Sequence, residues 1–299
     1  MTIEEDYELL RTGVAAVPVR RDVIQLSGKD AVSFLQGQCT QDIAPLGIGD
    51  SRDSLILEPR GFIDAQVRVT RTGDDELVLD TQGGWGQKVI ERLERFKLRV
   101  KVEITGLDWE CVALRGPSAS DPSVIDGATG VVLSLDASWP GLNGVDLLGP
   151  EIAAPPGIKT CSADAWKAVR IEAGIPQMGT EISEKTIPAE AGLVERCVSF
   201  TKGCFTGQEL VARLDSRGSN VARRLCGLVI ADHVALPEES DLTSNDGSAK
   251  SVGRVTLVGW SPGLNATVAL AYVHRSVEAG STVRAGNYEA EVRPLPLVG

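Results

Sequence analysis

One short segment combines a thiol with features that could activate it. Residues 202–213 read Lys-Gly-Cys-Phe-Thr-Gly-Gln-Glu-Leu-Val-Ala-Arg, and Cys204 lies two residues before the apolar pattern of a helix. Thr206 and Glu209 have the spacing of a capping box, which predicts Thr206 as the N-cap. The positive end of this helix and the nearby Lys202 would lower the pKa of the thiol and favour its nucleophilic form.

The same segment has a simpler interpretation. A small cysteine buried in a tight turn is the commoner arrangement, and Glu209 would then serve only as a helix cap. The predicted helix runs from Gly207 to about Asp215. Gly203 and Gly207 would let the backbone bend sharply or let a ligand approach it closely.

Composition and charge exclude several classes of protein. The chain has 299 residues, of which 42% are hydrophobic and 24% charged, as is ordinary for globular domains. A net charge of −11 disfavours broad electrostatic binding of nucleic acids. The acidic residues 1–6 do not resemble a signal peptide, and no apolar run reaches the roughly 18 residues that cross a bilayer. We therefore expect a cytoplasmic protein without membrane contact.

Cysteine and histidine usage argues against disulfides and zinc. The six cysteines form no CxxC pair, so a reducing compartment would keep them as free thiols. Neither His233 nor His274 lies close to a cysteine in the sequence. The motifs of serine-hydrolase elbows and of phosphate-binding loops are missing. The cysteines are Cys39, Cys111, Cys161, Cys197, Cys204 and Cys226.

Hydrophobic periodicity predicts helices mixed with strands in the first part of the chain. The clearest helix covers 84–97, where the apolar side chains form one stripe. A second helix begins after Ser162, an N-cap candidate, and runs to about Ala173. A short helix is expected at 28–37. The stripe of the clearest helix consists of Trp85, Val89, Leu93 and Phe96.

Turn-forming residues mark the boundaries of segments in the rest of the chain. Residues 136–160 are rich in Gly, Pro and Asn, which predicts a loop or linker. The part from residue 225 onward reads as short strands between turns, which predicts a small barrel or sandwich. Strands are expected at 14–19, 23–26, 54–57, 62–69, 77–79, 100–104, 109–114, 131–135, 225–230, 253–258 and 266–273.

The motif Lys202-Gly203-Cys204-Phe205-Thr206-Gly207-Gln208-Glu209 resembles the signature of the YgfZ family of folate-binding proteins, which are relatives of the glycine-cleavage T-protein. Three further segments agree with that family in order and spacing. They lie at 28–42, at 59–61 and at 170–176, the last followed by Pro188 and by 191–193. The resemblance covers about residues 20–225.

This resemblance implies an α+β fold of the T-protein type. The family forms a folate-binding clover-leaf of three subdomains around a central channel, with a small C-terminal β-barrel. Applied to this chain, residues 1–224 would form the T-protein-like folate-binding region as two interleaved α+β subdomains. Residues 225–299 would form the barrel.

The resemblance also implies a function. The family binds tetrahydrofolate or a one-carbon derivative of it, supports iron–sulfur cluster assembly and repair, and thereby indirectly supports tRNA modification. Cys204 would be the reactive residue of the motif at 202–209. The implied partners are folate and iron–sulfur assembly proteins or client enzymes, with no direct nucleic-acid binding. We expect no conventional turnover.

Three residues of the second predicted helix are expected folate contacts. Trp166 and Glu172 are carried over from the family, and Arg170 is added because of its spacing from Trp166. Trp166 and Arg170 are four residues apart and share one face, so an indole could stack on the pterin or aminobenzoyl ring while a guanidinium binds a glutamate carboxylate. Glu172 would bond the pterin amino groups. The alternatives are that Trp166 belongs to the core and that Glu172 is an exposed helix carboxylate.

Two positions depart from the related families, and other functions stay open. Ala65 stands where the T-protein carries the second aspartate of a doublet used in aminomethyl transfer. Arg21 stands at about the position where some YgfZ proteins carry a second ligand-contacting tryptophan. The alternative function is a folate-dependent aminomethyltransferase or demethylase, against which Ala65 weighs. A tRNA-modifying enzyme is a third hypothesis, which the net charge disfavours.

Overall fold

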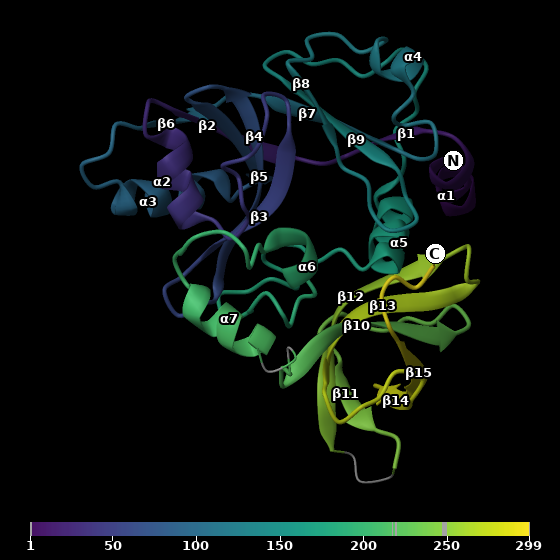
Figure 1. Cartoon of the computed structure of the whole chain (residues 1–299). Coiled ribbons are helices and arrows are strands. Elements are labelled where there is room, and N and C mark those ends of the chain that lie inside the picture. The colour runs from purple at the N-terminus through teal and green to yellow at the C-terminus, as the bar shows by residue number, and fades with distance from the viewer. Residues whose placement is uncertain (1, 217, 219, 247–249, 299) are drawn as a thin grey trace.

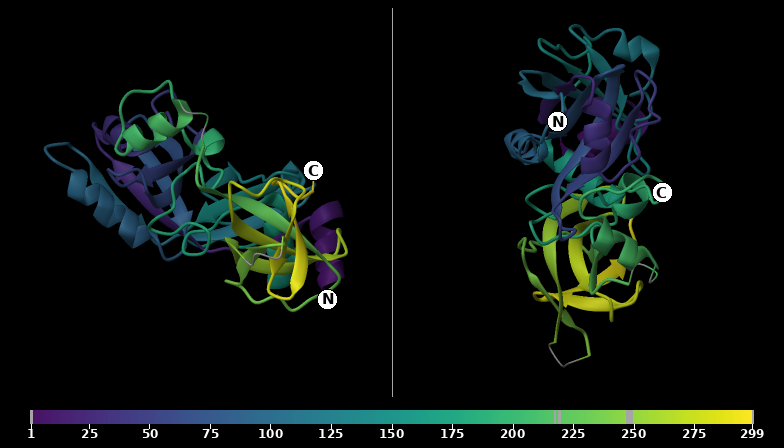
Figure 2. Two further views of the ribbon diagram at one scale, coloured as in Figure 1. Left: turned by 90° about the horizontal axis from the view of Figure 1, so that it is seen from below. Right: turned by 60° about the vertical axis from the view of Figure 1, so that its left-hand side comes forward.

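The chain folds into three β-structures joined by short helices. The computed structural model describes residues 2–216, 218, 220–246 and 250–298. Figure 1 shows two open sheets in the N-terminal part and a barrel in the C-terminal part. Figure 2 shows the barrel as a lobe separate from the sheet that contains β2 to β6.

Sheet 1 is antiparallel and has the strand order β1-β7-β9-β8. Its strands are β1 (Ala15–Val17), β7 (Glu110–Arg115), β9 (Gly144–Gly149) and β8 (Leu133–Asp136). The helix α1 (Ile3–Thr12) leads into it, with a complete capping box between Thr2 and Glu5. The short helix α4 (Pro122–Ile125) lies between β7 and β8 in the chain.

Sheet 2 is also antiparallel, in the order β3-β4-β5-β2-β6. Its strands are β2 (Arg21–Ser27), β3 (Ser51–Leu57), β4 (Ile63–Gly73), β5 (Glu76–Gln82) and β6 (Glu103–Leu107). Helices α2 (Ala31–Gln38) and α3 (Gly86–Phe96) contribute to its largest core cluster. Because the chain enters sheet 1, completes sheet 2 and returns to sheet 1, the two units are interleaved.

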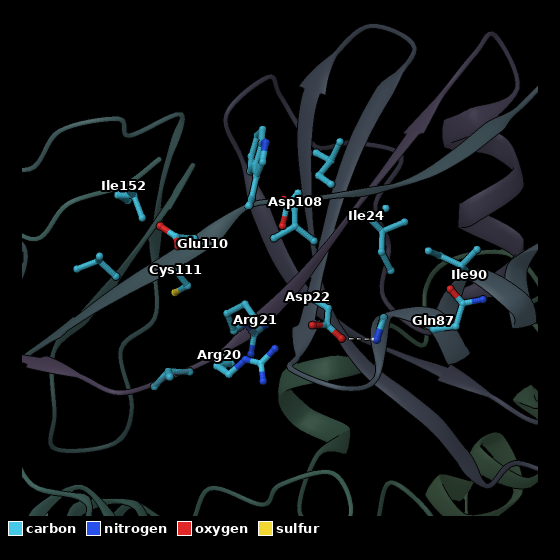
Figure 3. Close-up of a pocket in the computed structure, with 17 residues that line it drawn as sticks. Arg20, Arg21, Asp22, Ile24, Gln87, Ile90, Asp108, Glu110, Cys111 and Ile152 are labelled. Carbon is cyan, nitrogen blue, oxygen red and sulfur yellow. Dashed lines mark hydrogen bonds between the residues drawn. The ribbon is translucent and has the colours of Figure 1, made fainter. Parts of the chain in front are cut away.

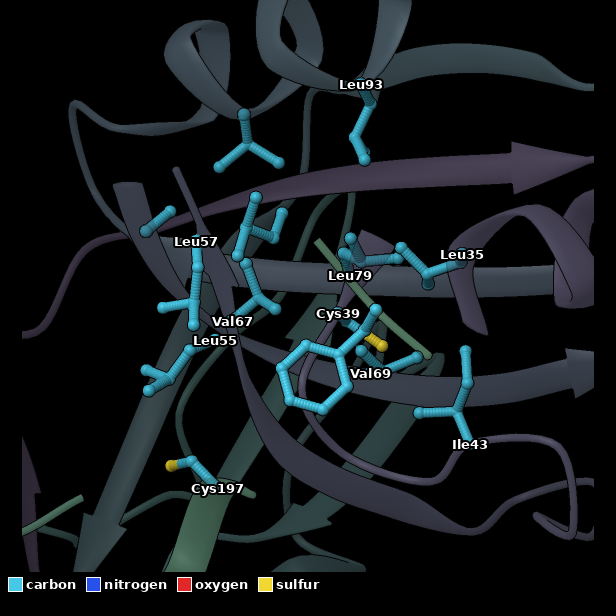
Figure 4. Close-up of a cluster of buried hydrophobic side chains, with 14 of the residues drawn as sticks. Leu35, Cys39, Ile43, Leu55, Leu57, Val67, Val69, Leu79, Leu93 and Cys197 are labelled. Atoms are coloured by element: carbon cyan, nitrogen blue, oxygen red, sulfur yellow. The ribbon is translucent and has the colours of Figure 1, made fainter. Parts of the chain in front are cut away.

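The main core lies on one face of sheet 2. Figure 4 shows Leu35 of α2 and Leu93 of α3 beside Val67 and Leu79 of the sheet. Side chains alternate between the faces of a strand, so Ala65, Val67 and Val69 of β4 enter this core while Gln66 and Arg68 emerge from the other face. That opposite face supplies part of the candidate site.

The C-terminal strands close into a barrel in the order β10-β13-β12-β11-β14-β15. This confirms the expected small barrel, whose first strand begins at Arg223. The strands are β10 (Arg223–Ala231), β11 (Asp241–Ser244), β12 (Ser251–Ser261), β13 (Ala266–His274), β14 (Thr282–Ala285) and β15 (Tyr288–Arg293).

Three helices connect the sheets to the barrel. The predicted helix after Ser162 is α5 (Ala163–Ala173), and the Ser162 hydroxyl accepts the Ala165 N–H as its cap. It contacts α1 and the barrel strands β12 and β13. The others are α6 (Val194–Cys197) and α7 (Gln208–Ser216). Within the described residues, no helix is long and apolar enough to span a bilayer.

The prediction of a loop or linker at 136–160 is wrong in its middle. These residues include β9, which is buried throughout and lies between β7 and β8. The Gly and Pro residues that suggested a linker only bracket this strand. Gly144 is required by packing, because a Cβ there would lie 2.7 Å from the Ala137 carbonyl oxygen and 2.7 Å from Cδ of Arg115.

Candidate functional site

A cavity lies between sheet 1, sheet 2 and α5, and we call it the central cavity. Its volume is about 110 Å³, and it is about 810 Å³ when the open space at the mouth is included. Sheet 2 contributes Gln66 and Arg68 from the face opposite its core, and sheet 1 contributes Arg115 and Asp146. The α5 helix contributes Trp166 and Arg170, as their shared helix face requires. Two of the three predicted folate contacts therefore meet in one cavity.

Two tryptophans form an aromatic wall of this cavity. Trp166 stacks against Trp139, with ring centroids 4.3 Å apart and an interplanar angle of 30°. The Arg115 guanidinium lies 5.5 Å from the Trp139 centroid and 5.6 Å from the Trp166 centroid. Trp139 was missed because it lies in the segment interpreted as a linker. The signal was a large aromatic residue in a Pro-Gly turn, which a solvated linker does not need.

A network of arginines and aspartates lies beside the tryptophans, and we call its arginines Arg21, Arg68 and Arg115 the arginine wall. Arg68 contacts Asp80 at 2.9 Å and Asp146 at 3.0 Å, so it joins the two carboxylates. Arg21 binds Asp80 through Nε at 2.6 Å, and Arg115 lies 2.8 Å from Asp146. Burial alone would raise the pKa of Asp146, but Arg115, Arg68 and Arg21 outweigh it and hold that pKa well below its usual range. Asp146 is therefore ionised at neutral pH and pairs with these arginines.

Arg170 is held in place but keeps free donors. Its Nη1 group donates to Glu181 and to the Ile175 carbonyl oxygen, both at 2.9 Å. Its Nε and Nη2 groups have no hydrogen-bond partner among the residues that the structure describes. A guanidinium fixed on one side and free on the other is suited to bind a carboxylate or carbonyl oxygen of a ligand.

Glu172 does not line the central cavity. Two residues beyond Arg170, it points about 200° away around the helix. Its side chain is 0% exposed, so it is not the exposed carboxylate of the alternative interpretation. The Tyr7 hydroxyl donates to both oxygens at 3.1 Å, Ser261 donates at 2.5 Å, and Arg11 pairs with the same group. Glu172 thus ties α1 and α5 to the barrel, and its role as a folate contact stays a prediction that this position does not favour.

The motif at 202–209 is anchored on both sides of its cysteine. The Lys202 ammonium donates to the carbonyl oxygens of Gln36, Cys39 and Gln41 at 2.6, 2.8 and 2.9 Å. Phe205 is buried in the core of sheet 2, whereas Cys204 between them is exposed. The Lys202 ammonium is thus committed to the end of α2. The alternative of a cysteine buried in a turn is wrong.

The predicted capping box is replaced by a different pairing. The helix α7 begins at Gln208, and Oε1 of Gln208 accepts the Phe205 N–H at 3.3 Å. Glu209 instead pairs with Arg213 at 2.5 Å, one turn along the helix. The Thr206 N–H donates to the Gly37 carbonyl oxygen at 3.2 Å. The helix itself is confirmed, but its start depends on contacts with α2 that local spacing does not encode.

Cys204 and the central cavity lie apart. We expected the thiol to face the folate site, but Cys204 is exposed, and the cavity lining includes none of the motif residues. The reason is that successive side chains of β4 point to opposite faces of sheet 2. The motif packs through Phe205 on the core face of sheet 2, whereas Gln66 and Arg68 reach the cavity from the other face.

The stretch around Ala65 lacks a free carboxylate for the cavity. Ala65 is buried in the core of sheet 2, and its neighbour Gln66 faces the cavity. Asp64 is engaged with α3, 3.2 Å from Arg92 and 3.7 Å from Lys88. An amide therefore faces the cavity from this part of β4, and an amide does not exchange a proton at neutral pH.

Comparison with known proteins identifies the type of fold. Residues 1–137 match the GCVT N-terminal domain, and residues 223–298 match the glycine cleavage T-protein C-terminal barrel domain. The chain belongs to the T-protein-like superfamily. The expected α+β fold of this type, with its C-terminal barrel, is thereby confirmed.

Individual relatives agree along most of the chain. An aminomethyltransferase of Thermus thermophilus is 28% identical over 332 aligned positions, which cover 99% of this chain and 90% of the relative. An uncharacterized protein of Haemophilus influenzae is 26% identical over 205 positions, covering 66% and 67%. The crystal structure of the glycine cleavage system aminomethyltransferase T from Bartonella henselae has a TM-score of 0.82 at 22% identity, covering 99% of this chain and 89% of that one.

Proposed function

We propose that this protein binds a reduced folate, tetrahydrofolate or a one-carbon derivative, in the central cavity. The observation that carries the proposal is the stacked pair Trp139 and Trp166 beside the free donors of Arg170. The indole pair provides a flat surface for the pterin or aminobenzoyl ring. Arg170 binds a glutamate carboxylate, and Gln66 supplies a neutral donor and acceptor.

We further propose that the protein supports iron–sulfur cluster assembly or repair without conventional turnover, as the YgfZ family does. Cys204 would be its reactive thiol. The anchored Lys202 and Phe205 hold the cysteine at the surface, where a protein partner can reach it. Folate binding and thiol chemistry would then use two separate sites. The partners would be iron–sulfur assembly proteins or client enzymes, with tRNA modification affected only through them.

The second candidate is a folate-dependent aminomethyltransferase or demethylase. It is favoured by the Thermus thermophilus relative, which is named an aminomethyltransferase and aligns with nearly the whole chain. The environment of Ala65 and Gln66 weighs against it, because neither side chain can orient an amine as a carboxylate does. Formation of methylenetetrahydrofolate from an aminomethyl or methylated donor would decide for this candidate.

Calorimetric titration of the purified protein tests the primary proposal. We expect saturable binding of tetrahydrofolate, and the methyl and formyl derivatives would show which one-carbon form the cavity prefers. Absence of heat and of thermal stabilisation with every derivative would contradict folate binding. A parallel assay with aminomethyl and methylated donors would separate binding alone from one-carbon transfer.

A further inference from the structure

The arginine wall of the central cavity carries an uncompensated positive charge. Three guanidiniums, those of Arg21, Arg68 and Arg115, share only the two carboxylates of Asp80 and Asp146. The two remaining arginines of the cavity add nothing to this surplus. Arg170 is neutralised by Glu181 at 2.9 Å, and Arg196 is neutralised by Asp53 at 2.5 Å.

A net positive charge in this position is unusual for the molecule. The whole chain carries a net charge of −11, yet this partly buried network has one positive charge more than negative. Charges removed from water are costly unless they are paired. An anionic group that enters the cavity would complete the network, so the cavity is electrostatically suited to a negatively charged ligand.

Arg21 is the member of the network with room for an anion. Its side chain is 21% exposed, compared with 6% for Arg68 and 3% for Arg115. Nε and Nη2 of Arg21 are used by Asp80, but Nη1 has no hydrogen-bond partner in the described part of the chain. Arg68 uses all three of its nitrogens. Nε of Arg115 has no hydrogen-bond partner among the described residues, but it is buried against Gly144, where even a Cβ would lie 2.9 Å from it.

The surroundings of Arg21 favour an approach from the central cavity. Arg21 also borders a groove on the outer side of the molecule, where Figure 3 shows it beside Arg20 and Cys111. That outer groove carries the carboxylates of Asp22, Asp108 and Glu110, which repel anions. Asp22 does not neutralise Arg21, because its Oδ2 accepts the N–H groups of Gly84 and Gly86, both at 2.8 Å.

We propose that Arg21 is a specificity-determining residue that binds a carboxylate of the ligand in the central cavity. The proposal rests on the proposed folate function and deepens it. Arg170 binds one carboxylate of the glutamate and Arg21 binds the other. The cavity would therefore distinguish folates with their glutamyl group from bare pterins, and it would use the surplus charge of the network to do so.

Arg21→Gln is a suitable variant because it balances the network. It leaves two arginines with two aspartates, so the empty protein should keep its fold, which circular dichroism and the Tm would verify. Arg20→Gln is the matched control. It removes the same charge from the adjacent residue, which borders the outer groove but not the central cavity.

The ligands are tetrahydrofolate and 6-methyltetrahydropterin, which has the ring but no carboxylate. We expect Arg21→Gln to weaken tetrahydrofolate binding about tenfold and to leave the pterin Kd unchanged. Arg20→Gln should change neither value. An unchanged tetrahydrofolate affinity in Arg21→Gln, or an equal loss for both ligands, would overturn the role of Arg21 while leaving folate binding intact.

A small dicarboxylate tests the anion site separately from folate. Glutarate should raise the Tm of the wild-type protein and of Arg20→Gln but not that of Arg21→Gln. If no folate binds to the wild-type protein and glutarate still gives this pattern, the folate function fails and the anion site stands. Equal effects of glutarate on all three proteins, or no effect on any, would remove the anion site.

Discussion

Trp139 and Trp166 stack on each other with their ring centroids 4.3 Å apart, although one comes from a turn before β9 and the other from α5. The contact joins sheet 1 to the helix that packs against the barrel. It also means that a ligand ring can cover only part of each indole. One tryptophan therefore supports the other, and both contribute to the surface that a ligand meets.

Replacing either tryptophan should weaken folate binding. Trp166→Ala removes a stacking surface and should cost about 1–3 kcal/mol of binding free energy, by analogy with alanine substitution at stacked bases. Trp139→Ala should also weaken binding, because the remaining indole loses its support. Calorimetric Kd values measure both effects.

A tryptophan outside the cavity provides the control for this prediction. Trp260 stacks on His233 at the barrel, so Trp260→Ala removes a comparable ring contact elsewhere. It should leave the Kd for tetrahydrofolate unchanged. If Trp166→Ala lowers the Tm and leaves the Kd as it was, Trp166 belongs to the core and not to the ligand site.

Cys204 should be the first cysteine to react with an alkylating reagent in the native protein. It is exposed, whereas burial raises the pKa of Cys161 to about 11 and that of Cys197 to about 12 and keeps them protonated. Burial also raises the pKa of Cys39, Cys111 and Cys226. Peptide mass spectrometry after brief iodoacetamide treatment should find the label at Cys204. Faster labelling of Cys111, which is partly exposed, would contradict this.

The functional role of the thiol has its own test. Cys204→Ser should leave the Tm and the tetrahydrofolate Kd unchanged, since the side chain is exposed and lies outside the cavity. It should abolish complementation of a defect in iron–sulfur cluster assembly. Retained complementation would remove the thiol from the mechanism. Cys226→Ser, in the barrel core, provides a comparison for purely structural effects.

The two glycines of the motif should respond differently to alanine. Gly207 has a φ of +81°, and a Cβ there would lie 2.5 Å from the Glu58 carbonyl oxygen, so Gly207→Ala should cost more than about 1 kcal/mol of stability. Gly203 has open space around its Cα and should tolerate alanine. Thermal denaturation of both variants measures the difference. Equal Tm values would show that the loop relaxes around the added methyl group.

Acid should destabilise the protein partly through Asp146. Its pKa is lower in the folded than in the unfolded chain, despite burial, because Arg115, Arg68 and Arg21 face it. The stabilisation is present above the unfolded value of about 4 and is lost as the pH falls toward the folded pKa. Asp146→Asn should cost about 3 kcal/mol at neutral pH, since it leaves three guanidiniums with Asp80 alone.

The comparison for that prediction is the slope of stability against pH. Urea denaturation between pH 7 and about pH 3 should show a shallower decline for Asp146→Asn than for the wild-type protein. Parallel curves for the two proteins would mean that other carboxylates account for the acid sensitivity.

The local elements could be read from the sequence because their causes are local. The apolar stripe of Trp85, Val89 and Leu93 produced α3, and the Ser162 cap produced the start of α5. Backbone hydrogen bonds within a helix and caps within one turn depend on neighbouring residues only. The motif at 202–209 also identified the family type, which the domain comparisons support at the level of the superfamily.

The central cavity was decided by tertiary structure alone. Nothing near Trp139 in the chain indicates that it meets Trp166, and Asp146 in β9 acquires its arginine partners from β4 and β7. The face of β4 that each side chain occupies depends on strand pairing, and this separates Cys204 from the cavity. The charge balance and the shape of the cavity depend on groups that only folding brings together. Burial makes the electrostatic interactions between these groups strong, whereas water screens them in the unfolded chain.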